Sequence, residues 1–85
     1  MRILYSSRFV RRYKKLPASV RLSAERRESL FRKDLKNPIL SIHKLKGKLS
    51  GLWAFSITDR YRIIFEFADD DTIIFHTVGD HDIYG

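Results

Sequence analysis

The sequence predicts an α+β fold in which two N-terminal helices pack on a mostly antiparallel four-stranded sheet, in the order β-α-α-β-β-β. Two patterns support this prediction. Apolar residues recur at helical spacing between residues 7 and 36, and from residue 53 onward they alternate with polar ones, as in strands. Eighty-five residues and 44% hydrophobic content suit one packed domain, which we place at 1–85.

The first half is expected to hold a short strand and both helices. Residues 2–5 read RILY, an apolar strand candidate, and the serine at position 6 or 7 can cap the helix that follows. One stripe of that helix is apolar: Phe9, Val10, Tyr13 and Leu16. Pro17 ends this helix and suits the first turn of a second one, which should run from about residue 17 to 36 and stop at the next Asn-Pro pair.

The second half is expected to form three strands, at 53–57, 61–67 and 72–78, because apolar side chains alternate there with period two. The connectors between them are short and polar, which predicts a meander of hairpins. In the last strand, strict alternation places Thr77 on one face and His76 on the other, the latter together with Val78.

The charge is unevenly distributed. Residues 1–36 contain twelve Lys or Arg and three Asp or Glu, whereas residues 37–85 contain five and seven. The net charge of +7 therefore comes from the first half and favours a polyanionic partner such as a nucleic acid over a merely soluble basic surface.

Several classes of protein are disfavoured. The chain has no Cys, so we expect neither disulfides nor thiolate metal sites, which is compatible with a cytoplasmic protein. No apolar run approaches the ~20 residues of a membrane span. The first residues, MRILYSS, do not have the pattern of a signal peptide.

Two internal segments carry candidate functional residues. In HKLKGKLSG, residues 43–51, an extended backbone would point His43 away from Lys46; the alternative is a solvated basic loop. Arg62 lies in the otherwise apolar strand YRIIF, where a charge is costly unless that face is open or the charge is paired. Arg62 is therefore either the cation of a cleft or a surface residue paired with Glu66 or a connector Asp.

The segment GDHDIYG, residues 79–85, follows directly on the last strand and contains His81 and Tyr84. A His and cations on one face are what metal-free RNA cleavage needs: a base for the 2′-OH, an acid for the 5′-oxygen and positive charge for the phosphorane. His titrates in the right range, and a Tyr can stack on a base. The acidic residues lack the spacing of a metal loop, so we expect no metal and no cofactor.

The segments HKLKGKLSGLWAFSITDRYRIIFEF and IIFHTVGDHDIY, in this order, resemble the RelE/ParE superfamily of type II toxin–antitoxin toxins, most closely the YafQ- and YoeB-like mRNA interferases. The resemblance covers nearly the whole chain. It implies a microbial-RNase-like fold, cleavage of mRNA in the ribosomal A site, and neutralisation by a cognate antitoxin.

The resemblance implies functional roles for five residues. His81 matches the family's proton-transfer His, and His43 matches the His that opens the "H-x-L-x-G" segment, with Lys46 as a nearby cation. Arg62 matches the recurring strand Arg, and Tyr84 matches the terminal aromatic residue.

The sequence also departs from the YafQ pattern. Ser56 stands near a position where those toxins carry a second His, and Thr77 replaces an Arg four residues before the terminal His. Arg62, with Arg60, would then have to hold the phosphate, whereas His76 is expected to be a half-buried structural residue. Two other functions remain open: a ParE-like non-enzymatic inhibitor of DNA gyrase, and a catalytically weakened relative that binds RNA or antitoxin.

Overall fold

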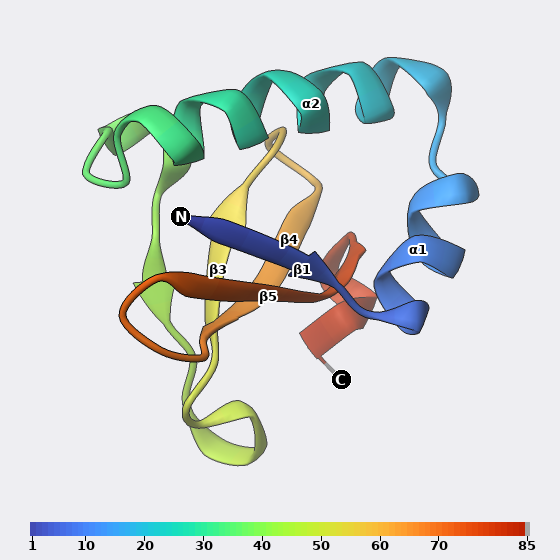
Figure 1. Cartoon of the computed structure of the whole chain (residues 1–85). Helices are drawn as coiled ribbons and strands as arrows, with labels where there is room; N and C mark the ends of the chain where they lie inside the picture. Colours follow the sequence, from blue (N-terminus) through green and yellow to red (C-terminus); the bar gives the residue numbers. More distant parts are fainter. Residues whose placement is uncertain (85) are drawn as a thin grey trace.

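The computed structural model describes residues 1–84. The chain forms strand β1 (Arg2–Tyr5), helices α1 (Ser7–Lys14) and α2 (Ala18–Lys33), and then strands β2 (His43–Lys44), β3 (Trp53–Ser56), β4 (Arg62–Phe67) and β5 (Thr72–Gly79). Three short 3₁₀ helices complete it: η1 (Pro38–Leu40), η2 (Gly47–Leu49) and η3 (His81–Tyr84). Figure 1 shows α2 crossing the sheet and α1 beside the end of β5.

The predicted α+β fold and its element order are confirmed, with one correction to the sheet. The sheet has five strands, not four, in the order β1-β5-β4-β3-β2. β1 pairs parallel with β5, and the other pairs are antiparallel. The additional strand β2 has only two polar residues, so it lacks the alternation that marked the other strands and is formed by pairing with β3.

The residues at the ends of α1 and α2 determine where these helices begin and end. The Ser6 hydroxyl caps α1 by accepting a hydrogen bond from the Phe9 N–H at 3.0 Å. Pro17 is the N-cap of α2. That helix ends at Lys33, three residues before the predicted end, because Asp34 has an extended backbone (φ −155°, ψ 89°).

The main core lies between the helices and one face of the sheet. Phe31 of α2 is fully buried, and its ring packs on Phe55, Phe65 and Phe75 with centroids 4.8, 5.1 and 5.6 Å away. Phe9 of α1 packs on Phe75 at 5.5 Å. These contacts join the helices to β3, β4 and β5, and they leave the opposite face for other elements.

We call that opposite face, turned away from α1 and α2, the outer face. On it, Ala54 and Ile64 are buried together with Ile83 of η3. Leucines from the β2–β3 segment pack against them: Leu45, Leu49 and Leu52. The outer face is therefore partly covered by η2 and η3, and the uncovered part is where a ligand could reach the sheet.

Strand β5 departs from the predicted alternation. Phe65 pairs with Phe75 and Ile64 pairs with Thr77, so His76 is an extra residue, a β-bulge. After the bulge, Val78 belongs to the main core and Thr77 lies opposite Ile64 on the outer face. The expectation that His76 shares a face with Val78 is wrong, because a bulge reverses the alternation beyond it.

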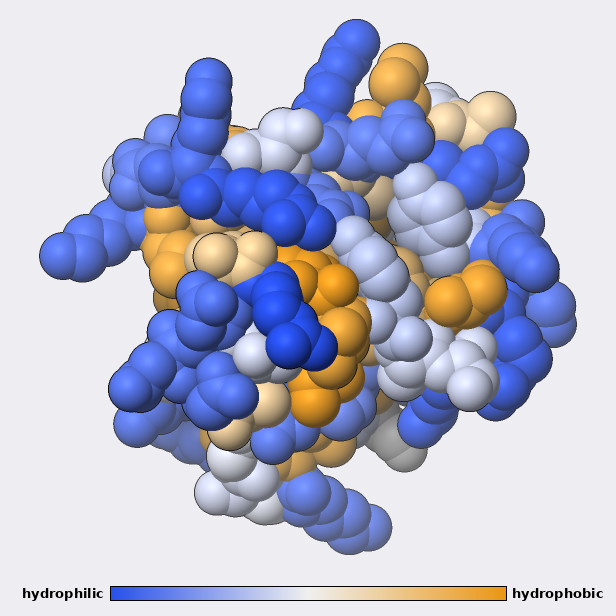
Figure 2. All heavy atoms as spheres, in the orientation of Figure 1, coloured by the Kyte–Doolittle hydropathy of each residue, from blue (hydrophilic) through white to orange (hydrophobic). Residues whose placement is uncertain are grey.

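Within residues 1–84, neither α1 nor α2 combines the length and the apolar run that a bilayer crossing needs. In Figure 2, hydrophilic side chains project around the visible face, and hydrophobic ones gather near its centre.

Candidate active site

One row of paired residues crosses the outer face. His43 pairs with Ala54, Ala54 with Ile64, and Ile64 with Thr77. Paired residues in a sheet point to the same face, so His43 shares the outer face with Thr77 at opposite ends of the row. Adjacent strands are ~4.8 Å apart, so three strand spacings separate these ends by roughly 14 Å.

The ring of His43 is held by its own chain. Its Nδ1 lies 2.9 Å from the Ser41 carbonyl oxygen. A carbonyl can only accept, so Nδ1 carries a proton, and in the neutral imidazole Nε2 is then the acceptor. Lys46 is exposed and is the N-cap of η2, close to His43 along the chain.

Arg62 begins β4 on the outer face, but its guanidinium turns toward the β3–β4 connector. Nη1 donates to the carbonyls of Thr58 at 2.8 Å, Asp59 at 3.1 Å and Tyr61 at 3.2 Å. Neither ion pair weighed from the sequence forms, because Glu66 pairs with His76 and Asp59 contributes its backbone carbonyl. Among the carboxylates of residues 1–84, none pairs with Arg62, so the connector carbonyls hold its positive charge there.

Tyr84 lies beside this cation. Burial raises the pKa of the Tyr84 phenol above its usual value of 10.0, and the Arg62 guanidinium opposes that rise. At neutral pH the phenol is therefore protonated and can donate a hydrogen bond. The structure brings together two of the five residues singled out from the sequence, one from β4 and one from η3.

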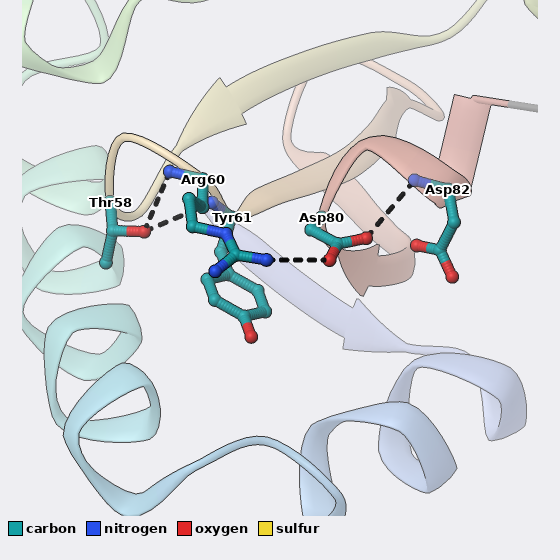
Figure 3. A network of polar contacts seen from close by, with 5 residues as sticks. All are labelled: Thr58, Arg60, Tyr61, Asp80 and Asp82. Atoms are coloured by element: carbon teal, nitrogen blue, oxygen red, sulfur yellow. Dashed lines mark hydrogen bonds and ion pairs between the residues drawn. The ribbon is translucent and has the colours of Figure 1, made fainter.

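The segment that carries His81 is anchored to the β3–β4 connector (Figure 3). Arg60 pairs with Asp80 at 3.6 Å, and the Asp82 N–H donates to Asp80 at 3.2 Å. The pKa of the Asp80 carboxyl lies below its usual range because of the Asp82 side chain and N–H, with Arg60 adding attraction. The Arg60 guanidinium is thus already paired with the Asp80 carboxylate.

His81 itself is the first residue of η3 and is exposed. Two residues along, Ile83 is 8% exposed and packs on Ala54 and Ile64. This packing joins η3 to the outer face. His81 is therefore an exposed side chain on a short helix that is docked to the outer face.

The polar contacts of His76 on β5 were not foreseen from the sequence. His76 Nε2 lies 2.7 Å from Glu66 Oε1, and the Ser6 hydroxyl donates to the His76 carbonyl at 2.7 Å. His76 is half-buried, as expected, but as part of a bulge pinned by α1 and β4. No local pattern marks a bulge at a given position, because it is defined by pairing with another strand.

The described part of the chain offers no preformed metal centre: in residues 1–84 no three His, Asp or Glu side chains come together as a ligand set. The arrangement does offer an imidazole, a guanidinium and a phenol at the outer face, and η2 and η3, which pack on that face, carry an exposed ammonium and a second exposed imidazole. These groups can exchange protons and bind anions.

No protein-family model and no curated protein matches the sequence. Solved structures do match it. YafQ from Escherichia coli BL21(DE3) matches with a TM-score of 0.78 and 19% identity, over 99% of this chain and 98% of that one. A chain of the RelB–RelE antitoxin–toxin complex from Methanococcus jannaschii matches with a TM-score of 0.76 and 27% identity, over 95% and 94%.

A third structure, a YoeB/ParE toxin from Agrobacterium tumefaciens, matches with a TM-score of 0.70 and 17% identity, over 95% of this chain and 99% of that one. All three agreements extend over nearly the full length at low sequence identity. The chain therefore has the fold of the RelE, YafQ and YoeB/ParE toxins.

Proposed function

We propose that this protein is the toxin of a type II toxin–antitoxin pair and that it cleaves mRNA on the ribosome. The observation that supports this proposal is that His43 and Arg62 share one sheet face, with Tyr84 beside Arg62 and the His81-bearing helix η3 docked on it, in a fold matched by toxin structures. Because the proposed activity needs ribosomes, the protein would act in the cytoplasm. The excess of Lys and Arg in residues 1–36 suits electrostatic attachment to ribosomal RNA.

In the proposed reaction the 2′-OH attacks the adjacent phosphorus and the 5′-oxygen leaves. His81 transfers one proton, and His43 transfers or positions the other through its free Nε2. Arg62 and Lys46 stabilise the negative charge that grows on the phosphorane. Tyr84, protonated and next to Arg62, orients the RNA through its hydroxyl or its ring.

The decisive experiment is a translation-coupled mRNA cleavage assay that compares the wild type with His81→Ala. We expect the wild type to cut and His81→Ala to lose about 100-fold or more in rate, as is typical for removal of a general acid or base. Asp70→Ala is the control, because Asp70 is exposed in the β4–β5 connector and belongs neither to the proposed site nor to the basic residues of 1–36.

Two outcomes would contradict parts of the proposal. If mRNA stays intact while growth stops and DNA supercoiling changes, the protein is a ParE-like inhibitor of gyrase. If His81→Ala cuts as fast as the wild type, the protein is still a nuclease but His81 is not its proton-transfer residue.

The proposed partner is a cognate antitoxin protein. The solved structures include the RelB–RelE complex and the DinJ–YafQ complex from E. coli, the latter with a TM-score of 0.74 and 17% identity over 98% and 97% of the two chains. Co-expression with the product of the adjacent gene should restore growth and yield a stable complex on size-exclusion chromatography.

A further inference from the structure

A small cavity opens beside the bulge of β5, at the edge where the outer face meets the first turn of α1. Its volume is about 290 Å³, near the lower end of the ~300–1,000 Å³ range of ligand pockets. It lies where the start of α1, strands β4 and β5, the η2 segment and η3 meet. The residues that line it are Ser6, Arg8, Leu49, Leu52, Ile64, His76, Thr77 and Ile83.

Thr77 gives this cavity an unused polar group. Its side chain is buried, with 6% exposure, and its Oγ1 has no hydrogen-bond partner among residues 1–84. Buried hydroxyls are nearly always hydrogen-bonded, because leaving one unpaired is unfavourable. Since Thr77 lines the cavity, a bound molecule can satisfy it.

Arg8 gives the rim a free positive charge. It is exposed in the first turn of α1 and forms no ion pair or side-chain hydrogen bond within the described residues 1–84. His76 completes the polar side of the cavity, and its bond to Glu66 at 2.7 Å fixes the ring. Ser6 is already engaged, because its hydroxyl both caps α1 and donates to the His76 carbonyl.

The remaining walls are aliphatic and come from Leu49, Leu52, Ile64 and Ile83. Aliphatic walls favour a flat apolar body, the buried hydroxyl favours a polar edge on that body, and the rim cation favours an anion. A nucleotide combines these three features, whereas inorganic phosphate has no apolar part and a nucleoside has no charge.

We propose that this cavity binds one nucleotide, with its base between the aliphatic walls, the Thr77 hydroxyl bonded to the edge of the base, and the phosphate on Arg8 beside His76. This inference rests on the proposed function for its substrate, RNA. It also supplies a role for the position where Thr77 replaces a cation, because the charge comes from α1 instead of β5.

The test is an NMR titration of the isotopically labelled protein with each of the four ribonucleoside 5′-monophosphates, with inorganic phosphate and with uridine. We expect at least one mononucleotide to shift the signals of Thr77, Ile64 and Ile83. It should bind more tightly than either inorganic phosphate or uridine.

Three variants make the titration specific. Arg8→Gln should weaken mononucleotide binding about tenfold through the loss of a charge-assisted contact, and the nearly isosteric Thr77→Val about fivefold. Arg2→Gln makes the same charge change on β1, away from the cavity, and should stay within about twofold, since it removes only screened long-range attraction.

The inference is overturned if no mononucleotide shifts the three signals at millimolar concentration, if inorganic phosphate binds as well, or if Arg2→Gln weakens binding as much as Arg8→Gln. This binding test is separate from the cleavage assay. If the protein binds nucleotide in the cavity but leaves mRNA intact, the cavity proposal is supported and the nuclease proposal is wrong. If it cleaves mRNA but binds no nucleotide in the cavity, the nuclease proposal is supported and the cavity proposal is wrong.

Discussion

Arg62 combines two tasks in one side chain. Three backbone carbonyls of the β3–β4 connector accept from its Nη1, so it fastens the loop that also carries Arg60. Its charge also lies beside Tyr84, where the proposed phosphate contact would form. The geometry allows both uses at once, because one nitrogen holds the connector and a guanidinium has further N–H groups.

Replacing Arg62 should therefore affect both stability and activity. We expect Arg62→Ala to keep the fold but to lower the free energy of unfolding by about 1.5–3 kcal/mol, the range for hydrogen bonds to a charged group. Urea denaturation followed by circular dichroism measures this. Arg62→Lys, which retains the charge without the fork of donors, should lose less. An Arg62→Ala variant with an unchanged unfolding midpoint would show that the connector does not depend on it.

The short helix η3 is positioned by close packing against the end of β5. A Cβ atom added at Gly79 would lie 2.4 Å from Ile83 Cγ2, so η3 can only dock where the strand has no side chain. Gly79 is not needed here for a left-handed backbone but for this close approach.

We expect Gly79→Ala to displace η3 and to destabilise the protein by about 1–3 kcal/mol, the usual cost of overpacking. Proposed cleavage should fall as well, because His81 and Tyr84 move with η3. A double-mutant cycle with Ile83→Ala provides the control, since removing Cγ2 should make the second substitution nearly neutral. Additive losses in the thermal denaturation of the double variant would contradict this account.

The anchoring of η3 should also depend on pH. The folded-state pKa of Asp80 is lower than its ordinary value, so its contribution is complete above that ordinary value, about 3.9, and is lost as pH falls through the lowered pKa. In a His81→Ala background, NMR signals of Ile83 and Tyr84 should therefore remain constant near neutrality and shift only in acid. In Asp80→Asn this acid shift should be absent, and an equally large shift there would assign it to another group.

The molecule as a whole depends on one aromatic cluster. Phe31 is fully buried and packs on rings from β3, β4 and β5, which makes it the central contact between α2 and the sheet. We expect Phe31→Ala to cost about 3–5 kcal/mol, a large part of the ~5–15 kcal/mol that stabilises a small domain.

Thermal denaturation should then show a Phe31→Ala variant that is partly unfolded at 37 °C, while Phe31→Leu retains a cooperative transition at reduced temperature. Phe67, which is 41% exposed, is the control: Phe67→Ala removes the same side chain from the edge of the cluster and should cost much less. Equal losses at the two positions would contradict the central role of Phe31.

Sequence alone was enough to predict the α+β class, the two helices and the strands β1, β3, β4 and β5. These elements depend on the period of apolar residues and on capping residues such as Ser6 and Pro17, which act within a few positions of the chain. The predicted alternation also continues through β4, where Ile63 and Phe65 lie in the main core, opposite Ile64.

The tertiary structure alone decided the rest. Strand β2, the bulge at His76 and the cavity between Arg8 and Thr77 each depend on two or more segments of the chain that meet only in the fold. The physical reason is that periodicity reflects the geometry of one backbone segment, whereas pairing register and cavity shape are set by several segments packing at once. Local patterns in this chain therefore determined its elements, and the packing of those elements decided which of its charges share a site.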